Sequence, residues 1–366
     1  MARTKIAPDK IRLEASTVCQ LRCPSCPTTT GEIARHLKSG FLKFDQFRKF
    51  IDENPRIRSI ELSNWGESLL NPQFLQMLEY AHARRVELRL GNGANLNMVK
   101  PEVLEGVVKY QLRAITCSID GASAATYPLY RVRGDFDRVI GNIERINEFK
   151  RKYDSPYPRL TWQFVAFGHN EHEIERARAM AARLDMRFAL KLDWENLYDT
   201  PSFSPIRERD LIAKETGLGV ATRAEYQEKF GQPYIAKTLC VQMWTGPQIN
   251  FDGRVLGCCV NYWDDFGNAF TDGLSKVLNS ERMQYARRML MGKAPARDDI
   301  ACTTCKFYLA MNETSTWITD KDLAVLPRRI DSIISRMRRR ARSALRRFAS
   351  AGRGAKASAV SHHRAD

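Results

Sequence analysis

The sequence predicts an α/β fold in which helices cover a parallel sheet, and three observations support this prediction. First, strand-like and helix-like patterns alternate between residues 11 and 193, as they do where crossover helices join parallel strands. Second, alternating apolar residues predict six strands, at 11–13, 60–62, 86–90, 115–119, 160–167 and 188–192. Third, apolar residues at helical spacing predict helices between them, at 41–51, 72–81, 101–108, 136–146 and 174–184.

The first predicted strand leads into a loop with three closely spaced cysteines. Cys19, Cys23 and Cys26 follow the spacing C-x3-C-x2-C. An odd number of thiols cannot pair among themselves, and such short gaps favour wrapping around a metal over disulfide formation. Thiolates suit zinc as well as iron–sulfur clusters, so a zinc loop is an alternative at this point. With three local ligands, a four-iron cluster would keep one iron open to another molecule.

This cysteine spacing, at the head of a strand–helix series, resembles the signature of the radical S-adenosylmethionine (SAM) superfamily. The resemblance implies that residues 1–195 form an open, partial (βα)6 TIM-like barrel with its chemistry at the carboxyl ends of the strands. It also implies that Cys19, Cys23 and Cys26 hold a [4Fe-4S] cluster that binds SAM. In this superfamily SAM is cleaved reductively, and the resulting 5′-deoxyadenosyl radical takes a hydrogen atom from the substrate.

The segment after the second predicted strand resembles the superfamily's glycine-glycine-glutamate segment, which holds the amino group of SAM. Gly66 and Glu67 match that pattern, whereas Trp65 and Ser68 depart from it. An ordinary strand-to-helix loop would explain the glycine, but it would not explain a glutamate at a strand end. The resemblance therefore implies that Gly66 and Glu67 contact SAM.

The ends of the next two predicted strands add further implied SAM contacts. The third strand is predicted to end in a tight turn at 91–93, and the resemblance places Asn92 of this turn beside the ligand. At the end of the fourth strand, the resemblance implies that Ser118 and Asp120 contact SAM, with the serine near the ribose hydroxyls.

An arginine-containing loop follows the fourth predicted strand. The resemblance implies that one of its arginines binds the methionine carboxylate of SAM; Arg131 matches best, and Arg133 is the alternative. The chemistry is suitable because a planar guanidinium pairs bidentately with a carboxylate. Cys117, on the strand itself, is predicted to be a small core residue and not a metal ligand.

A second group of cysteines follows a proline- and charge-rich connection at 196–239 and comprises Cys240, Cys258, Cys259, Cys302 and Cys305. Four of them form C-x17-C-x43-C-x2-C, and a hairpin is predicted at 251–255, just before the adjacent pair. Four thiolates suit structural zinc or a fully ligated iron–sulfur cluster, and the spacing alone does not separate the two.

Behind a radical SAM core, this second group resembles the SPASM/twitch extension, which implies a small, cysteine-rich α+β domain at 240–312. The full SPASM form carries more cysteines, so the shorter twitch form with one auxiliary [4Fe-4S] cluster is the better match. The implied ligands are Cys240, Cys258, Cys302 and Cys305. Cys259 competes with Cys258, which is preferred because it lies nearer the predicted hairpin turn.

Composition is typical of a globular protein from a reducing compartment. The chain is 43% hydrophobic and 27% charged, and it contains nine cysteines but no secretion signal. We therefore expect a cytoplasmic protein.

The chain's positive charge is concentrated near its carboxyl end. Between Arg328 and Lys356, eleven basic residues and one Asp carry +10 of the formal net charge of +16. A basic amphipathic helix is predicted at 313–348 and a disordered tail at 349–366. Such a helix favours peripheral contact with an anionic membrane over specific nucleic-acid binding, because no aromatic residues interleave its arginines. A solvated tail that binds nothing is the alternative.

The resemblance implies a radical SAM oxidoreductase served by a flavodoxin- or ferredoxin-type electron donor. We expect it to dehydrogenate or epimerise a small, sugar-like molecule such as a cyclitol, since the cysteine loop begins at residue 19 and no peptide-recognition domain precedes it. A maturase that modifies a ribosomal peptide is the alternative within the class. A zinc-binding adaptor whose basic tail binds membrane or RNA is the alternative of another class. Oxidation of an alcohol would need a base, for which His169, Lys191 and Asp193 are candidates.

Overall fold

The computed structural model describes residues 4–194 and 203–324, and it contains the predicted parallel sheet. Its strands lie in the order β6-β5-β4-β3-β2-β1-β7, and all neighbours are parallel. They are β1 (Lys10–Leu13), β2 (Ser59–Glu61), β3 (Glu87–Ala94), β4 (Ala114–Ser118), β5 (Arg159–Ala166), β6 (Met186–Leu192) and β7 (Gln248–Ile249). The edge strands β6 and β7 do not pair, so the predicted open, partial barrel is confirmed.

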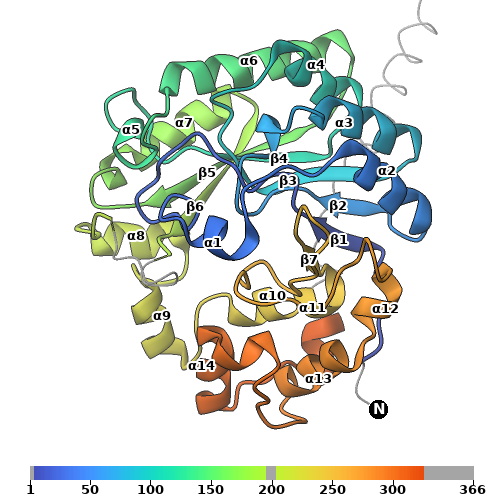
Figure 1. The fold of residues 1–366 in the computed structure, drawn as a ribbon. Helices are drawn as coiled ribbons and strands as arrows, with labels where there is room; N and C mark the ends of the chain where they lie inside the picture. Colours follow the sequence, from blue (N-terminus) through green and yellow to red (C-terminus); the bar gives the residue numbers. More distant parts are fainter. Residues whose placement is uncertain (1–3, 195–202, 325–366) are drawn as a thin grey trace, which may run out of the picture. The chain divides into compact units, whose positions relative to one another are not determined.

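One layer of helices covers the outer face of this sheet (Figure 1). These helices are α2 (Phe44–Glu53), α3 (Phe74–Ala83), α4 (Pro101–Lys109), α6 (Phe136–Lys152) and α7 (Ile174–Arg183). The C-terminal helices lie on the other side of the strands in Figure 1. They are α10 (Ala236–Cys240), α11 (Gln242–Thr245), α12 (Leu274–Leu278), α13 (Glu281–Leu290) and α14 (Lys306–Thr314). The short helices α1 (Glu32–Leu37) and α5 (Tyr127–Tyr130) belong to loops at the strand ends.

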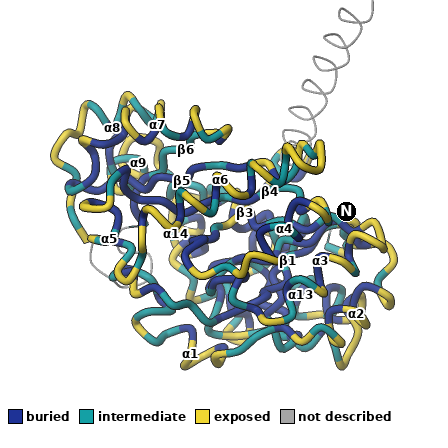
Figure 2. The backbone as a smooth tube through the Cα atoms, turned by 90° about the horizontal axis from the view of Figure 1, so that it is seen from above, coloured by how far each residue is buried: buried dark blue, intermediate teal, exposed yellow. Residues whose placement is uncertain are grey.

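The core lies between the sheet and its outer helices, and buried residues follow the strands through the molecule (Figure 2). On β5, Trp162 faces this core and lies 6.5 Å from Phe136 of α6, measured between ring centroids. Val165, three residues further on, faces the opposite side and packs against Leu21 and Cys23 of the cysteine loop. The inner face of the barrel therefore carries the candidate site, while the outer face provides the hydrophobic core.

A seventh strand extends the sheet beyond the six that the sequence predicts. β7 pairs with β1, with Arg12 opposite Gln248 and Leu13 opposite Ile249. The predicted hairpin follows it, since Ile249 bridges Val255 in antiparallel fashion. This pairing joins the C-terminal extension to the core, and residues Met1–Ile318 form one compact unit.

The tight turn predicted at 91–93 is wrong, because β3 continues through these residues to Ala94. A register shift between Leu90 and Ala94 accommodates the extra length as an irregularity in the pairing with β4. Side chains from the end of the preceding strand replace the turn's own hydrogen bonds. Gly91 N–H donates to the Glu61 carboxylate at 2.8 Å, and Asn92 N–H donates to Ser63 Oγ at 3.1 Å.

The connecting segment and the C-terminal tail are described only in part. The connection contains α8 (Arg209–Thr216) and α9 (Arg223–Phe230). The helix predicted at 313–348 is interrupted at its start, because α14 ends at Thr314 and Ser315 has a left-handed φ of 53°. The rest of that helix, from residue 325, and the tail at 349–366 lie outside the described residues.

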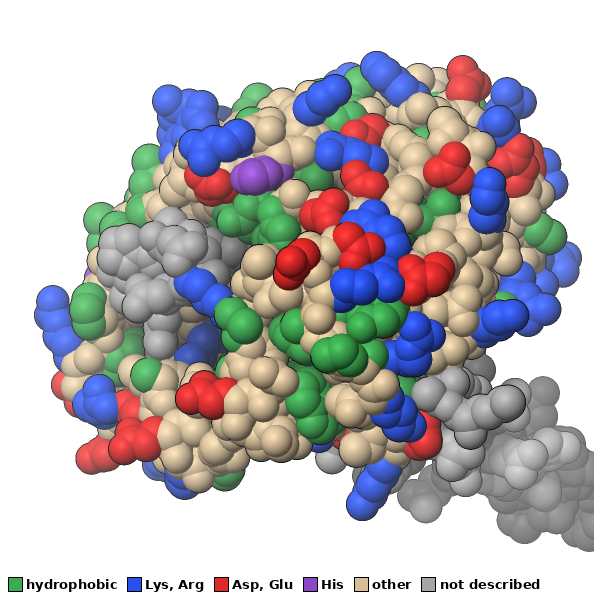
Figure 3. Space-filling model, turned by 60° about the horizontal axis from the view of Figure 1, so that its bottom comes forward, with side chains coloured by type: hydrophobic (Ala, Val, Ile, Leu, Met, Phe, Trp, Pro, Cys, Tyr) green, Lys and Arg blue, Asp and Glu red, His purple; other side chains and the backbone are tan. Residues whose placement is uncertain are grey.

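Charges are interspersed on the face of the molecule drawn in Figure 3, where acidic and basic side chains lie next to one another. Over the residues that the structure describes, no helix has the length and apolar character needed to cross a membrane.

Candidate functional site

The cysteine loop follows β1 and covers the inner face of the barrel. Cys23 is buried, and Cys19 and Cys26 are half-buried against the same apolar cluster. Cys26 N–H donates to the Cys23 carbonyl at 3.1 Å, which folds the loop back so that the thiols are near one another. Three thiols from one short loop thus gather at the carboxyl ends of the strands.

These thiols lie in surroundings that disfavour an uncompensated negative charge. Burial raises the pKa of Cys19 to about 12 and that of Cys23 to about 11. Two donors nevertheless reach the sulfur atoms: Asn95 Nδ2 lies 3.7 Å from Cys19 Sγ, and Arg131 Nη1 lies 3.6 Å from Cys23 Sγ. Buried thiols with such donors fit a cationic metal cluster, whose charge would stabilise the thiolates.

The loop after β2 brings Gly66 and Glu67 under the cysteine loop. A Cβ atom on Gly66 would lie 2.3 Å from the Ser16 carbonyl oxygen, so only glycine fits this close approach. Glu67 is buried, and its carboxylate accepts the N–H groups of Asn95, at 2.5 Å, and Leu69, at 3.1 Å. Burial raises the pKa of Glu67 to about 7, and these hydrogen bonds limit the rise.

A second buried carboxylate fixes the start of this loop. Glu14, just after β1, accepts hydrogen bonds from Asn64 N–H at 3.3 Å and Trp65 N–H at 3.1 Å. Burial raises the pKa of Glu14 to about 8. Sequence reasoning missed this residue, since an isolated glutamate at a strand end has no distinctive spacing.

Asn92 and Ser118 lie on the adjoining strands of the same inner face. Asn92 Nδ2 donates to Asn64 Oδ1 at 2.9 Å, which ties it to the loop after β2. Ser118 is buried at the end of β4, and its Oγ would lie 2.7 Å from a Cβ on Gly93. Asn92 and Ser118, predicted to contact SAM, therefore lie on the same inner face as Gly66 and Glu67, which are also predicted to contact SAM.

Arg131 is already engaged by an acid. Its Nε and Nη2 each lie 2.6 Å from Asp120 Oδ2, and Asp120 is fully buried. The other oxygen of Asp120 accepts Val165 N–H at 2.7 Å. Arg133, the alternative, is exposed. The structure thus brings Arg131, Asp120 and Cys23 together and leaves Arg133 outside the group.

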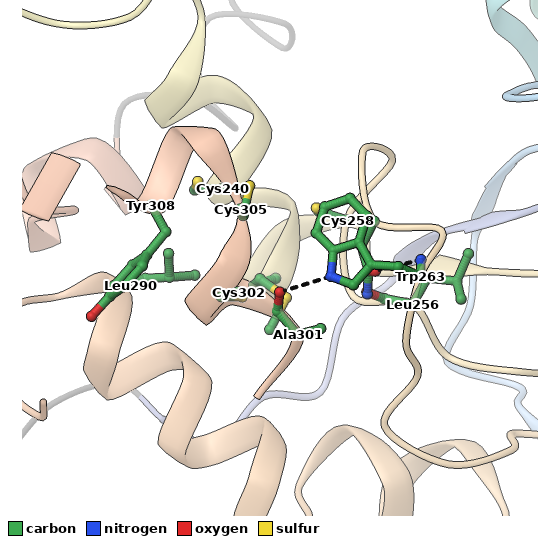
Figure 4. Close-up of a pocket in the computed structure, with 11 residues that line it drawn as sticks. Cys240, Leu256, Cys258, Trp263, Leu290, Ala301, Cys302, Cys305 and Tyr308 are labelled. Atoms are coloured by element: carbon green, nitrogen blue, oxygen red, sulfur yellow. Dashed lines mark hydrogen bonds between the residues drawn. The ribbon is translucent and has the colours of Figure 1, made fainter. Parts of the chain in front are cut away.

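The second group of cysteines surrounds a pocket in the C-terminal extension. Four thiols from three segments face it: Cys240 at the end of α10, Cys258 after the hairpin, and Cys302 and Cys305 before α14. Figure 4 shows these side chains around the pocket, with Trp263 Nε1–H donating to the Ala301 carbonyl at 3.0 Å. Burial raises the pKa of all four thiols, with that of Cys258 at about 12. Four thiols around one pocket, one on a buried cysteine and the others on half-buried ones, fit a fully ligated iron–sulfur cluster.

Cys259, the neighbour of Cys258, has other partners. Gln242 brackets it, since Nε2 lies 3.4 Å from the thiol and Oε1 accepts its backbone N–H at 2.9 Å. Its carbonyl accepts a hydrogen bond from Asn64 Nδ2 at 3.0 Å. Cys259 does not line the pocket. Its bond with Asn64 instead links the extension to the loop that holds Gly66 and Glu67.

The three candidate bases differ in their surroundings. His169 stacks on Phe167, with ring centroids 5.4 Å apart, and burial lowers its pKa. Asp193 is buried at the end of β6. Lys191 is half-buried on the inner face, and burial together with the charge of Arg223 lowers its pKa to about 8.

Sequence reasoning also missed Asn95 and Gln242, which support sulfur atoms in the two groups. Asn95 directly follows β3, so the rule that sites form at strand ends could have identified it. Gln242 lies two residues after Cys240 and carries no sequence signal. Among the described residues, no group of three or more His, Cys, Asp or Glu side chains is arranged to hold a single metal ion.

Family models match both cysteine groups. A model described as the radical SAM superfamily matches residues 13–181, and one described as an iron–sulfur cluster-binding domain, SPASM, matches residues 240–306.

Two curated proteins resemble parts of this chain. An AdoMet-dependent heme synthase of Methanosarcina barkeri is 30% identical over 180 residues, which cover 49% of this chain and 48% of that protein. Mycofactocin maturase MftC of Mycobacterium tuberculosis is 26% identical over 142 residues, which cover 38% of this chain and 34% of that protein. The chain thus spans less than half the length of either relative.

Solved structures share the fold at low sequence identity. SuiB of Streptococcus suis, bound to S-adenosylmethionine, has a TM-score of 0.59 and 12% identity, over 82% of this chain and 71% of that one. The protein anSMEcpe with bound AdoMet has a TM-score of 0.55 and 14% identity, over 88% of this chain and 98% of that one. At this identity the likeness concerns the fold alone.

Proposed function

The chain belongs to the radical SAM superfamily and carries an SPASM iron–sulfur domain, and from this premise we propose that it oxidises an organic substrate by hydrogen-atom abstraction. As a member of the superfamily it is an enzyme with SAM and iron–sulfur clusters as cofactors. The observation that carries the proposal is the pair of thiol groups, one at the barrel's strand ends and one around the pocket of the extension.

The bound cofactors supply one electron for reductive cleavage of SAM and the 5′-deoxyadenosyl radical that removes the substrate hydrogen. Cys19, Cys23 and Cys26 hold the cluster of the barrel, and Asn95 and Arg131 donate to its sulfur ligands. Cys240, Cys258, Cys302 and Cys305, which line one pocket, would hold the auxiliary cluster, and this cluster would supply an acceptor for the second electron of the oxidation.

The residues around SAM bind and orient it. Gly66 allows the loop after β2 to approach the cysteine loop, and Glu67, held by Asn95, takes the amino group. Asn92 and Ser118 line the same face. Arg131, oriented by Asp120, takes the methionine carboxylate, for which it must give up or share that partner. The resemblance of these segments to the superfamily's SAM-binding segments supports this assignment.

The substrate belongs to one of two classes, a peptide or a small non-peptide molecule. The similarity to a mycofactocin maturase favours modification of a peptide, while the similarity to a heme synthase points to a non-peptide molecule. Neither relative is named for a sugar, so dehydrogenation or epimerisation of a sugar or cyclitol stays a prediction from the sequence. A flavodoxin- or ferredoxin-type donor would supply the first electron.

The proposal assigns a separate role to each part of the chain. Residues 1–195 bind SAM, 196–239 carry substrate-facing loops and 240–312 hold the auxiliary cluster. Membrane contact through 313–348 stays a prediction, because most of that segment lies outside the described residues.

The proposal is tested by incubating the anaerobically reconstituted protein with SAM and dithionite. We expect methionine and 5′-deoxyadenosine in equal amounts, measured by liquid chromatography with mass detection. Absence of 5′-deoxyadenosine from a protein with a full complement of iron would contradict the proposed function.

Replacing Gly66 with alanine is expected to weaken SAM binding and to lower the free energy of unfolding by about 1–3 kcal/mol, because the new Cβ meets backbone atoms. Gly141→Ala is the matched control. Gly141 lies in α6 with no atom near its Cβ position, so alanine there is expected to stabilise the helix by roughly 0.5–1 kcal/mol. Chemical denaturation and SAM titration measure both effects; equal SAM affinity in the two variants would contradict the role of Gly66.

A further inference from the structure

The inner face of the barrel has polar side chains on β5 and β6 that the proposed SAM and cluster sites do not use. Val165 of β5 faces the cysteine loop, where it packs with Cys23. Lys191 of β6 lies opposite Val165 in the parallel register. Paired residues of neighbouring strands face the same side of a sheet, so Lys191 also faces the cysteine loop.

The ammonium group of Lys191 lies on this face without an acidic side chain paired to it among the described residues. The described part of the chain offers its Nζ no hydrogen bond and no ion pair. Asp120 is the carboxylate whose charge acts on it, and Asp120 is already paired with Arg131 at 2.6 Å. Arg223, also near enough to act on it, adds positive charge. A half-buried lysine without an acid is costly to fold unless it serves a ligand.

Gln163 adds an acceptor on the same face. It lies two residues before Val165, so it faces the same way, and it is 7% exposed. Its Oε1 is buried and accepts no hydrogen bond from any described residue. Its partner in the register is Ala189, two residues before Lys191 on β6, so Gln163 and Lys191 lie on the same face of the sheet. A buried, unpartnered acceptor in a native structure calls for a donor from elsewhere.

We propose that Lys191 and Gln163 form a subsite for a substrate carboxylate that has a hydrogen-bond donor beside it. This inference rests on the proposed function, since it assigns the substrate to the face below the proposed SAM contacts. The carboxylate pairs with Lys191 Nζ, and the neighbouring N–H or O–H donates to Gln163 Oε1. The C-terminal residue of a peptide and a hydroxy acid both have this chemistry, whereas a neutral sugar does not.

The test is protection of Lys191 from acetylation, which needs no turnover. The reconstituted holoenzyme with SAM is treated with a trace of N-hydroxysuccinimidyl acetate, and labelling of Lys191 is measured by peptide mass spectrometry. Exposed Lys214 of α8 serves as the internal reference. N-acetylglycine represents a peptide C-terminus, glycolate represents a hydroxy acid, and N-acetylglycinamide is the neutral control. Sodium chloride keeps the ionic strength equal in every sample.

We expect N-acetylglycine or glycolate at saturation to slow labelling of Lys191 about tenfold relative to Lys214, as occupancy of about 90% requires. The better of the two protectors identifies the source of the carboxylate. Gln163→Leu is expected to weaken binding of N-acetylglycine about fivefold, the value of one hydrogen bond. Acetate, a further probe with a carboxylate but no neighbouring donor, is expected to protect Lys191 equally in this variant and in the unchanged protein.

No protection by either carboxylate, or equal protection by the neutral amide, would overturn the subsite. Unchanged N-acetylglycine affinity in Gln163→Leu would overturn the part assigned to Gln163. Formation of 5′-deoxyadenosine is measured separately. A protein that forms 5′-deoxyadenosine but shows no protection of Lys191 would overturn only the subsite. A protein that shows protection but forms no 5′-deoxyadenosine would contradict only the proposed function.

Discussion

Cys23→Ala is expected to lower the rate of 5′-deoxyadenosine formation from SAM by more than about a hundredfold. Removing a residue that only hydrogen-bonds to a metal ligand already lowers activity by up to about a hundredfold, and here the ligand itself is removed. Cys23 is the buried member of the three thiols, and Arg131 lies beside its sulfur at 3.6 Å. Without this ligand, the two remaining thiols of the loop cannot hold a four-iron cluster. The variant should also lose roughly four irons and the corresponding EPR signal.

The matched control is Cys117→Ala. Cys117 is fully buried on β4 and belongs to neither cysteine group, so its replacement should cost about 1 kcal/mol of stability and spare the iron content. A Cys23 variant that still forms 5′-deoxyadenosine at the wild-type rate would refute the assignment of the barrel site. Similar iron loss in both variants would point to misfolding as the cause.

Cys258→Ala is expected to remove the auxiliary cluster and stop substrate oxidation, while cleavage of SAM continues. Cys258 lines the pocket with Cys240, Cys302 and Cys305. Its loss leaves three thiols on two separate segments, without the single short loop and the SAM molecule that complete the three-cysteine site of the barrel. About four irons should remain, because the barrel cluster is independent of this pocket.

Cys259→Ala provides the comparison, since this neighbouring thiol contacts Gln242 and lies outside the pocket. It should retain the full iron content measured by colorimetric assay. If Cys259→Ala lost four irons and Cys258→Ala kept them, the ligand assignment would be reversed. If both variants kept all their iron, the pocket would not be a cluster site.

The sequence was sufficient for the sheet because the pattern of buried and exposed residues follows local alternation. It did not predict β7, since two residues are too short for a periodic signal and their pairing with β1 is a long-range contact. It misjudged 91–93 because Glu61, at the end of β2, and Ser63, just after that strand, supply the hydrogen bonds that keep β3 extended.

The metal-binding cysteines of the candidate site could be predicted from the sequence, but the contacts between their neighbours could not. Spacing identified the cysteines, but the choice between Cys258 and Cys259 depends on the direction of each side chain, which adjacency in sequence does not determine. The pairing of Arg131 with Asp120 joins residues eleven positions apart through the fold. Glu14 is notable for its burial and Gln163 for a buried acceptor without a partner among the described residues, and both features are visible only in three dimensions.

The most direct measurement is the iron, sulfide and zinc content of the anaerobically purified protein, combined with EPR of the dithionite-reduced sample with and without SAM. The account predicts about eight irons and eight sulfides, from two [4Fe-4S] clusters, and a change in one cluster signal when SAM is added. Zinc alone, found reproducibly in protein kept from oxygen, would contradict it and would favour the zinc-binding adaptor.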